Sequence, residues 1–125
     1  MTTATLTRTS LRLRALTVLL WTLQIASAAL FLFSGTLKLS GAPMMVQMFG
    51  AIGLGQWFRY FTGGLEVISA VLLCVPSLAL FGALAMAVTM VGAILTHLFI
   101  VGGNPAVPIA LLAATTTIAS LRSRD

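Results

Sequence analysis

Residues 57–75 and 78–101 read WFRYFTGGLEVISAVLLCV and LALFGALAMAVTMVGAILTHLFIV, and only Pro76 and Ser77 separate the two runs. Each run is mostly apolar and close to the roughly 20 residues that an α-helix needs to cross a bilayer. Because so short a connection allows only a tight turn, the two helices should lie antiparallel and side by side. The stretch therefore predicts a hairpin of two membrane-spanning helices.

Two further apolar segments flank this hairpin, at about residues 15–39 and 106–121. The second follows Gly-Gly-Asn-Pro at 102–105, a sequence typical of turns. Of the 125 residues, 59% are hydrophobic and 7% are charged, whereas soluble domains carry about 25% charged residues. Four spans use nearly the whole chain. We therefore predict an all-α protein, an integral membrane four-helix bundle with one transmembrane domain at residues 15–121.

The segments outside the spans are short. Residues 1–14 are polar and contain three arginines, so we expect a basic N-terminal arm that is disordered or interfacial, and residues 122–125 form a tail. A cleaved signal peptide does not fit, because the apolar run after the arm is longer than a signal-peptide core of about 7–15 residues. Pro43 suits the first turn of a helix, and we expect a short interfacial helix from there to about residue 52.

The basic residues predict the orientation of the chain in the membrane. Four spans place both termini on one side, and that side carries Arg8, Arg12, Arg14, Arg122 and Arg124, whereas the other carries Lys38 and Arg59. Cytoplasmic flanks of membrane helices are enriched in lysine and arginine. We therefore expect both termini in the cytoplasm, with the basic ends in contact with anionic lipid headgroups of the bilayer.

Several classes of function do not fit the composition. The net charge of +5 comes from basic residues that flank the apolar segments, so nucleic-acid binding is not predicted. A single cysteine, Cys74, excludes an intramolecular disulfide and a CxxC redox centre. One histidine and one carboxylate within the spans are too few for a tetrahedral zinc site, so no metal is predicted. The chain also has no P-loop and no dinucleotide-binding motif.

Polar side chains follow one face of each of the first two spans. Residues 24, 27, 31, 34 and 38 are spaced by three and four, and so are residues 59, 62, 66 and 69, as on one face of a helix. Because polar side chains avoid lipid, we expect the two stripes to face each other. Small residues allow helices to pack closely, and we assign that role to Gly63, Gly64, Gly82 and Gly92.

Lys38, Glu66 and His97 all fall in the outer half of the predicted bundle. Glu66 lies about nine residues into its span, which is roughly 13 Å from the outer interface. An ionisable group at this depth is costly and marks a functional site by default. We therefore interpret the three residues as a ligand-binding or proton-handling cluster. The secondary candidates are Gln24, Ser34, Trp57, Arg59, Tyr60, Thr62 and Thr96, and no residue is assigned a catalytic role.

Structural interpretations of the same residues stay open. Glu66 could form an interhelical ion pair with Lys38 or Arg59 that only fixes packing, and His97 could be a bundle histidine with its hydrogen bonds satisfied. Lys38 could be an interfacial lysine that extends its aliphatic stem toward the headgroups. Arg59 could be an anchor at the headgroup level.

Four segments, in this order, resemble the DoxX-like family of small bacterial four-helix membrane proteins. They are residues 33–39 (FSGTLKL), 43–45 (PMM) with 53–58 (GLGQWF), 60–66 (YFTGGLE) and 90–98 (MVGAILTHL). The resemblance implies a compact bundle in the bacterial inner membrane, with Lys38, Glu66 and His97 as the candidate site and Trp57 and Tyr60 at its mouth. It implies little about activity: founding members are described as a subunit of a thiosulfate–quinone oxidoreductase, relatives are linked to oxidative-stress complexes, and most members have no assigned reaction.

The leading hypothesis is an accessory subunit, rather than an enzyme on its own, that binds a lipophilic molecule such as a quinone and supports a redox-protein partner. Glu66 and His97 would hydrogen-bond the headgroup or relay its proton, and Lys38 would modulate Glu66. The first alternative is a purely structural scaffold that assembles as a homo-oligomer or with a partner. The second is a small proton-coupled transporter, although the first span lacks the acidic residue that small multidrug exporters carry there.

Overall fold

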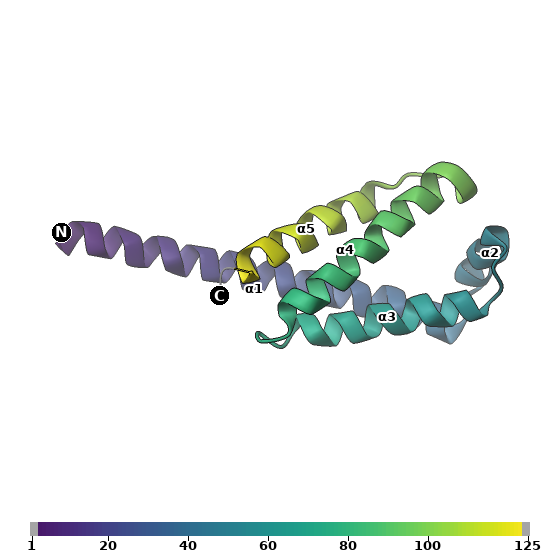
Figure 1. Ribbon diagram of the computed structural model, residues 1–125, viewed down its shortest axis with the longest axis horizontal. Helices are drawn as coiled ribbons and strands as arrows, with labels where there is room; N and C mark the ends of the chain where they lie inside the picture. The colour runs from purple at the N-terminus through teal and green to yellow at the C-terminus, as the bar shows by residue number, and fades with distance from the viewer. Residues whose placement is uncertain (1–2, 124–125) are drawn as a thin grey trace.

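The computed structural model describes residues 3–123, and these residues form helices and turns without any strand (Figure 1). The elements are α1 (Thr3–Ser40), α2 (Pro43–Ile52), α3 (Trp57–Leu73), α4 (Ala79–Thr96), the π-helical turn η1 (His97–Val101) and α5 (Ala106–Arg122). The all-α prediction is confirmed. Arg124, which was assigned to the cytoplasmic tail, lies outside the described residues.

The four long helices pack as two pairs, α1 on α3 and α4 on α5 (Figure 1). The turn between α3 and α4 lies at the same end as the C-terminus, and from there the two helices diverge toward the other end, where α2 and η1 lie. Helices α3 and α4 therefore form the predicted hairpin, but they are separated at the end opposite the turn.

The short helix α2 begins and ends where the sequence predicts. Pro43 occupies the first turn, where a missing N–H costs nothing. Gly53 ends the helix in the left-handed conformation, with φ of 85°, and its N–H donates a hydrogen bond of 3.3 Å to the carbonyl oxygen of Phe49. Glycine adopts this conformation without steric cost.

The N-terminal arm is helical, so the expectation that it could be disordered is wrong. Helix α1 begins at Thr3 and continues without interruption into the first predicted span. The arm contains no glycine or proline, and its leucines and arginines favour helix. The hydroxyl of Thr7 donates to the carbonyl oxygen of Thr3 at 3.0 Å, and that of Thr9 donates to Thr5 at 3.1 Å, so these side chains are satisfied within the helix.

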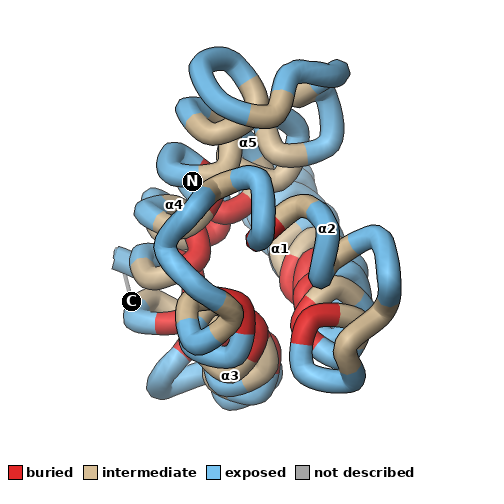
Figure 2. The backbone as a smooth tube through the Cα atoms, turned by 90° about the vertical axis from the view of Figure 1, so that its right-hand side faces the viewer, coloured by how far each residue is buried: buried red, intermediate tan, exposed pale blue. Residues whose placement is uncertain are grey.

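The buried residues form a small core on the sides of the four long helices that face one another (Figure 2). Many large apolar side chains are exposed on the outside. The core consists of Ala28, Phe31, Ala70, Leu73, Ala83, Met86, Met90 and Ile118. Among the exposed side chains are Phe33, Val88 and Phe99, with 65%, 74% and 79% of their surface accessible. Large contiguous apolar surfaces of this kind are uncommon on soluble monomers.

Two helices are long and apolar enough to cross a membrane, namely Thr3–Ser40 and the continuous stretch Ala79–Val101. Helix α5 is apolar but shorter, with 17 residues. Helix α3 also has 17 residues and contains Arg59 and Glu66. Crossing of a membrane by all four long helices stays a prediction.

Glycines bring the helix backbones into contact at two crossings. At the crossing of α1 and α3, a Cβ atom on Gly63 would lie 2.9 Å from Lys38 Cβ and 3.0 Å from the carbonyl oxygen of Gly35. At the crossing of α3 and α4, a Cβ on Gly82 would lie 3.0 Å from the carbonyl oxygen of Ser69. The close-packing assignment is right for Gly63 and Gly82. It is wrong within this chain for Gly64 and Gly92, beside which the described residues leave open space.

This difference predicts opposite effects for two neighbouring substitutions. Gly63→Ala should lower the free energy of unfolding by about 1–3 kcal/mol, because the backbones of α1 and α3 must separate to admit the methyl group. Gly64→Ala should be neutral or stabilising by up to about 1 kcal/mol, because alanine favours helix over glycine. Thermal unfolding in mild detergent measures both, and equal midpoints for the two variants would contradict the observed crossing.

Candidate functional site

Lys38 and Glu66 form a buried ion pair between α1 and α3. The ammonium nitrogen of Lys38 lies 3.1 Å from Oε1 and 3.3 Å from Oε2 of Glu66, and it also donates to the hydroxyl oxygen of Ser34 at 2.7 Å. Only 3% of the Glu66 side chain and 11% of the Lys38 side chain are accessible. The two polar stripes therefore meet as the sequence predicts, and Ser34 belongs to the same cluster.

The close crossing of α1 and α3 at two glycines explains why this ion pair is buried. Gly35 and Gly63 stand next to the ion pair, and their backbones approach so closely that no side chain fits between them. The two charges therefore lie in a medium of low polarity, where an unpaired charge would be costly. With both carboxylate oxygens near the ammonium group, each charge depends on the other.

Arg59 joins three helices at the α2 end of the structure. Its Nη1 donates to the carbonyl oxygen of Lys38, one of the carbonyls at the end of α1 that lack a partner within the helix. Its Nε donates to Gln56 Oε1 at 2.8 Å, and Gln56 Nε2 donates to the carbonyl oxygen of Val46 in α2 at 3.1 Å. A cation at a helix C-terminus is favourable. Arg59 is 5% exposed, so it acts as a buried helix cap in place of the headgroup anchor that we considered.

His97 lies apart from this ion pair in the hydrogen-bond network. It is the first residue of η1, and its Nδ1 lies 3.0 Å from the carbonyl oxygen of Ala93 in its own helix. No hydrogen bond links it to Glu66 or Lys38 within the described residues. Of the three predicted residues, the structure joins Lys38 to Glu66 and gives His97 a different setting.

That setting is an open groove of about 430 Å³ between α2 and η1. Its polar side chains are His97, Gln47 and Asn104, and the remaining lining comes from Met44, Met48, Ala51, Ile100, Val101, Gly102 and Gly103. Sequence reasoning did not assign Gln47 or Asn104 to a site. The signal for Gln47 was present, since it is the one strongly polar residue of α2.

The hydrogen bond of His97 fixes which nitrogen is available to a ligand. A carbonyl oxygen can only accept, so Nδ1 carries the hydrogen that points to Ala93. In the neutral imidazole, Nε2 is then an acceptor, and it has no hydrogen-bond partner among the described residues. His97 thus lines the groove together with the amide of Gln47 and the adaptable thioethers of two methionines.

The sequence profile of the DoxX-like family matches residues 22–120 of this chain. The chain belongs to the DoxX-like family. The match includes the ion pair, Arg59 and the groove, and it begins after the basic arm. No curated protein and no solved structure is significantly similar to the chain.

The remaining candidates of this DoxX-like chain make local contacts. The hydroxyl of Thr62 donates to Phe58 O at 2.9 Å and that of Thr96 to Gly92 O at 2.8 Å, each within its own helix. Trp57 is exposed and packs edge to face on Phe58 with 5.7 Å between ring centroids. Tyr60 is exposed, with the Arg59 guanidinium 4.3 Å from its ring centroid.

Gln24 belongs to the opposite end of the structure. Its Nε2 donates to the carbonyl oxygen of Leu73 at 2.7 Å, and its Oε1 accepts a hydrogen bond from Arg122 Nε at 2.8 Å. It lies fourteen residues before Lys38 on α1, or roughly 21 Å along the helix. Gln24 therefore ties α1 to the ends of α3 and α5 and is not part of the Lys38–Glu66 cluster. Within residues 3–123, no group of three His, Cys, Asp or Glu side chains is placed to hold a metal ion.

Breaking the ion pair should destabilise the fold. Glu66→Gln leaves the Lys38 ammonium buried without its counter-charge, so we expect a loss of about 3–5 kcal/mol in unfolding free energy. The double variant Lys38→Met/Glu66→Leu should lose clearly less than Glu66→Gln, because no charge is left unpaired. Thr62→Val, one turn away on α3, serves as the matched control and should change little. Detergent unfolding of wild type and the three variants measures this, and a loss in the double variant equal to or larger than that in Glu66→Gln would contradict the coupling.

Proposed function

We propose that this protein is a four-span protein of the bacterial inner membrane that binds a lipophilic molecule of the quinone class. In this proposal it is an accessory subunit of a membrane redox system and works with a redox-protein partner. The observation that carries the proposal is the groove between α2 and η1, in which His97 presents a free acceptor nitrogen beside Gln47 and two methionines.

The apolar outer surface supports membrane insertion. Residues 15–39, the predicted first span, are helical throughout and extend roughly 38 Å along the helix, enough to cross the roughly 30 Å of a bilayer hydrocarbon core at a tilt. Large apolar side chains on all four long helices point outward. A shell of lipid would cover them, whereas water would leave them exposed.

The groove suits an apolar ligand with one polar end. The residues that line the groove, other than His97, Gln47 and Asn104, are apolar residues and glycines. Small-molecule sites combine such apolar surfaces with a few well-placed polar groups. A quinone, when bound, supplies redox chemistry for a partner. His97 Nε2 can accept a hydrogen bond from the hydroxyl of the reduced form, and the Gln47 amide can donate to a carbonyl oxygen or accept from a hydroxyl. The π-helical turn beside the groove is a rare conformation that recurs at functional sites.

Placing the ligand at His97 gives Glu66 a structural role. Its carboxylate is buried and both oxygens are close to Lys38, so a ligand would have to displace the ammonium group to reach it. The two parts of the predicted cluster then have separate functions: the ion pair fixes α1 against α3, and His97 contacts the ligand.

The single native cysteine provides a test of the four-span topology. Cys74 is exposed at the turn between α3 and α4, which is on the cytoplasmic side if both termini are cytoplasmic. A membrane-impermeant maleimide should therefore leave Cys74 unlabelled in intact spheroplasts and label it in inverted vesicles. The variant Phe99→Cys/Cys74→Ser should show the reverse pattern, because η1 lies at the other end. Labelling of Cys74 from outside would overturn the orientation.

Ligand retention tests the function. His97→Ala should lower the amount of quinone that co-purifies by about five- to tenfold, the value of one hydrogen bond of roughly 1 kcal/mol or slightly more. Mass spectrometry of the organic extract from gently purified protein measures it. Phe99→Ala, in the same π-helical turn but outside the groove lining, is the matched control and should retain the ligand. Ordinary phospholipid alone in wild type and both variants would overturn the proposal.

A structural scaffold is the second candidate function. It is favoured by the number of side chains that serve only to join helices, among them the Lys38–Glu66 pair and the contacts of Gln24 with Leu73 and Arg122. A scaffold would lose its homo-oligomer or its partner, and no small molecule, when these contacts are broken. Cross-linking in native membranes alongside the extraction experiment separates the two functions.

A further inference from the structure

The first half of α1 extends beyond the rest of the molecule (Figure 1). Residues 3–19 are exposed on every side of the helix, and burial begins only at Leu20 and Trp21. The family match also begins after this segment, at residue 22. Residues 3–19 therefore form an exposed helix, and we refer to them as the N-terminal extension.

The N-terminal extension carries three positive charges without compensation. Arg8, Arg12 and Arg14 make no ion pair or hydrogen bond with any residue in 3–123, and the extension contains no acidic residue. Of the two acids of the chain, Glu66 is paired with Lys38 at the other end of α1. An anionic surface outside the chain would complement these three exposed guanidinium groups.

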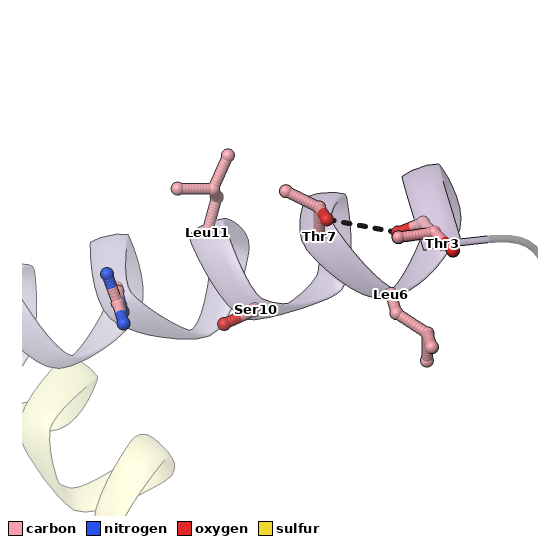
Figure 3. Close-up of a pocket in the computed structure, with 6 residues that line it drawn as sticks. Thr3, Leu6, Thr7, Ser10 and Leu11 are labelled. Carbon is pink, nitrogen blue, oxygen red and sulfur yellow. Dashed lines mark hydrogen bonds between the residues drawn. The ribbon is translucent and has the colours of Figure 1, made fainter.

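The rest of the extension is less polar than its sequence suggests. The hydroxyls of Thr7, Thr9 and Thr17 each donate to the carbonyl oxygen one turn earlier, as Thr7 does to Thr3 (Figure 3). Leu6 and Leu11 point out from opposite sides of the same stretch (Figure 3), and they are 55% and 59% exposed. A shallow depression along this stretch is completed by Ser10 and Arg14. Leucine side chains are therefore exposed on more than one side of this basic helix, which suits an inclined path through the headgroup layer better than a position flat in the interface.

We infer that the N-terminal extension binds the anionic phospholipid headgroups of the leaflet on the side of the termini. Arg8, Arg12 and Arg14 bind lipid phosphates, for which the planar guanidinium supplies paired N–H donors. Leu11, which lies closer to the predicted span than Leu6, enters the boundary between headgroups and acyl chains. This inference rests on the membrane insertion in the proposed function, and it is independent of the groove and its ligand.

The length of α1 agrees with this placement. Its 38 residues span roughly 57 Å, more than the roughly 40–45 Å of a complete bilayer with its headgroups. A tilt of about 40°, the upper end of the range for membrane helices, reduces the span along the bilayer normal to roughly 44 Å. Both ends of α1 then lie in headgroup layers, with the arginines at one end and Lys38 at the other.

The test uses the full chain in lipid nanodiscs. Leu11→Cys in a Cys74→Ser background carries an environment-sensitive fluorophore, and the neutral quencher acrylamide reports its exposure to water. Discs of phosphatidylcholine alone are compared with discs that also contain phosphatidylglycerol. We expect several-fold weaker quenching in the anionic discs, and we expect high salt to reverse the effect. Each of Arg8→Gln, Arg12→Gln and Arg14→Gln should shift the bound-to-free equilibrium by about fivefold.

The controls separate this inference from the proposed function. A label at Phe99→Cys, in η1 at the opposite end, should be quenched equally in both lipids. A chain that enters discs but shows the same quenching at residue 11 in both lipids overturns the headgroup inference alone, whereas a chain that does not enter discs overturns membrane insertion first. Energy transfer between labels on two chains, equal in both lipids, would assign the extension to a second copy and also overturn the inference.

Discussion

The buried Lys38–Glu66 ion pair is the contact on which the arrangement of the other helices depends. It fixes the register of α1 against α3, because the two charges can pair only where the Gly35–Gly63 crossing lets the backbones meet. Removing one partner of a buried ion pair costs more free energy of unfolding than the intact pair contributes. Other registers of α1 against α3 are therefore disfavoured mainly because they would leave a buried charge unpaired.

The contacts at the two ends of the helix bundle explain why one end of the bundle is closed and the other open. Near the C-terminus, Gln24 holds the ends of α3 and α5, and Gly82 keeps α4 against α3. At the other end Arg59 holds α1, α3 and, through Gln56, α2, but no such polar link reaches α4 in the described residues. Helix α4 is therefore free to diverge from α3, and α2 with η1 borders the groove that this leaves.

Sequence reasoning predicted the contacts that follow from helical periodicity, but it could not predict those that depend on the angles between helices. The stripes ending at Lys38 and Glu66 meet because a polar face must turn from lipid, and this follows from spacing alone. Spacing predicted that His97 lies at the same end of the bundle as Lys38, which the structure shows (Figure 1), but it could not predict the lateral distance of His97 from Glu66, which depends on how far α4 diverges from α3. The choice of Lys38 over Arg59 as partner of Glu66 also needed the structure, since Arg59 is taken by the end of α1. The arm was judged by its polar composition, although it lacks glycine and proline and its threonines bond within the helix.

The separation of the ion pair from His97 has a physical rationale. A carboxylate that must stay ionised to hold two helices together is a poor group for proton transfer or ligand exchange, because each protonation would leave the lysine without its partner. An imidazole whose Nδ1 hydrogen bonds within its own helix can exchange ligands at Nε2 without disturbing any other helix. The stabilising charge and the exchangeable acceptor are thus on different helices, so ligand binding at the groove need not weaken the crossing of α1 and α3.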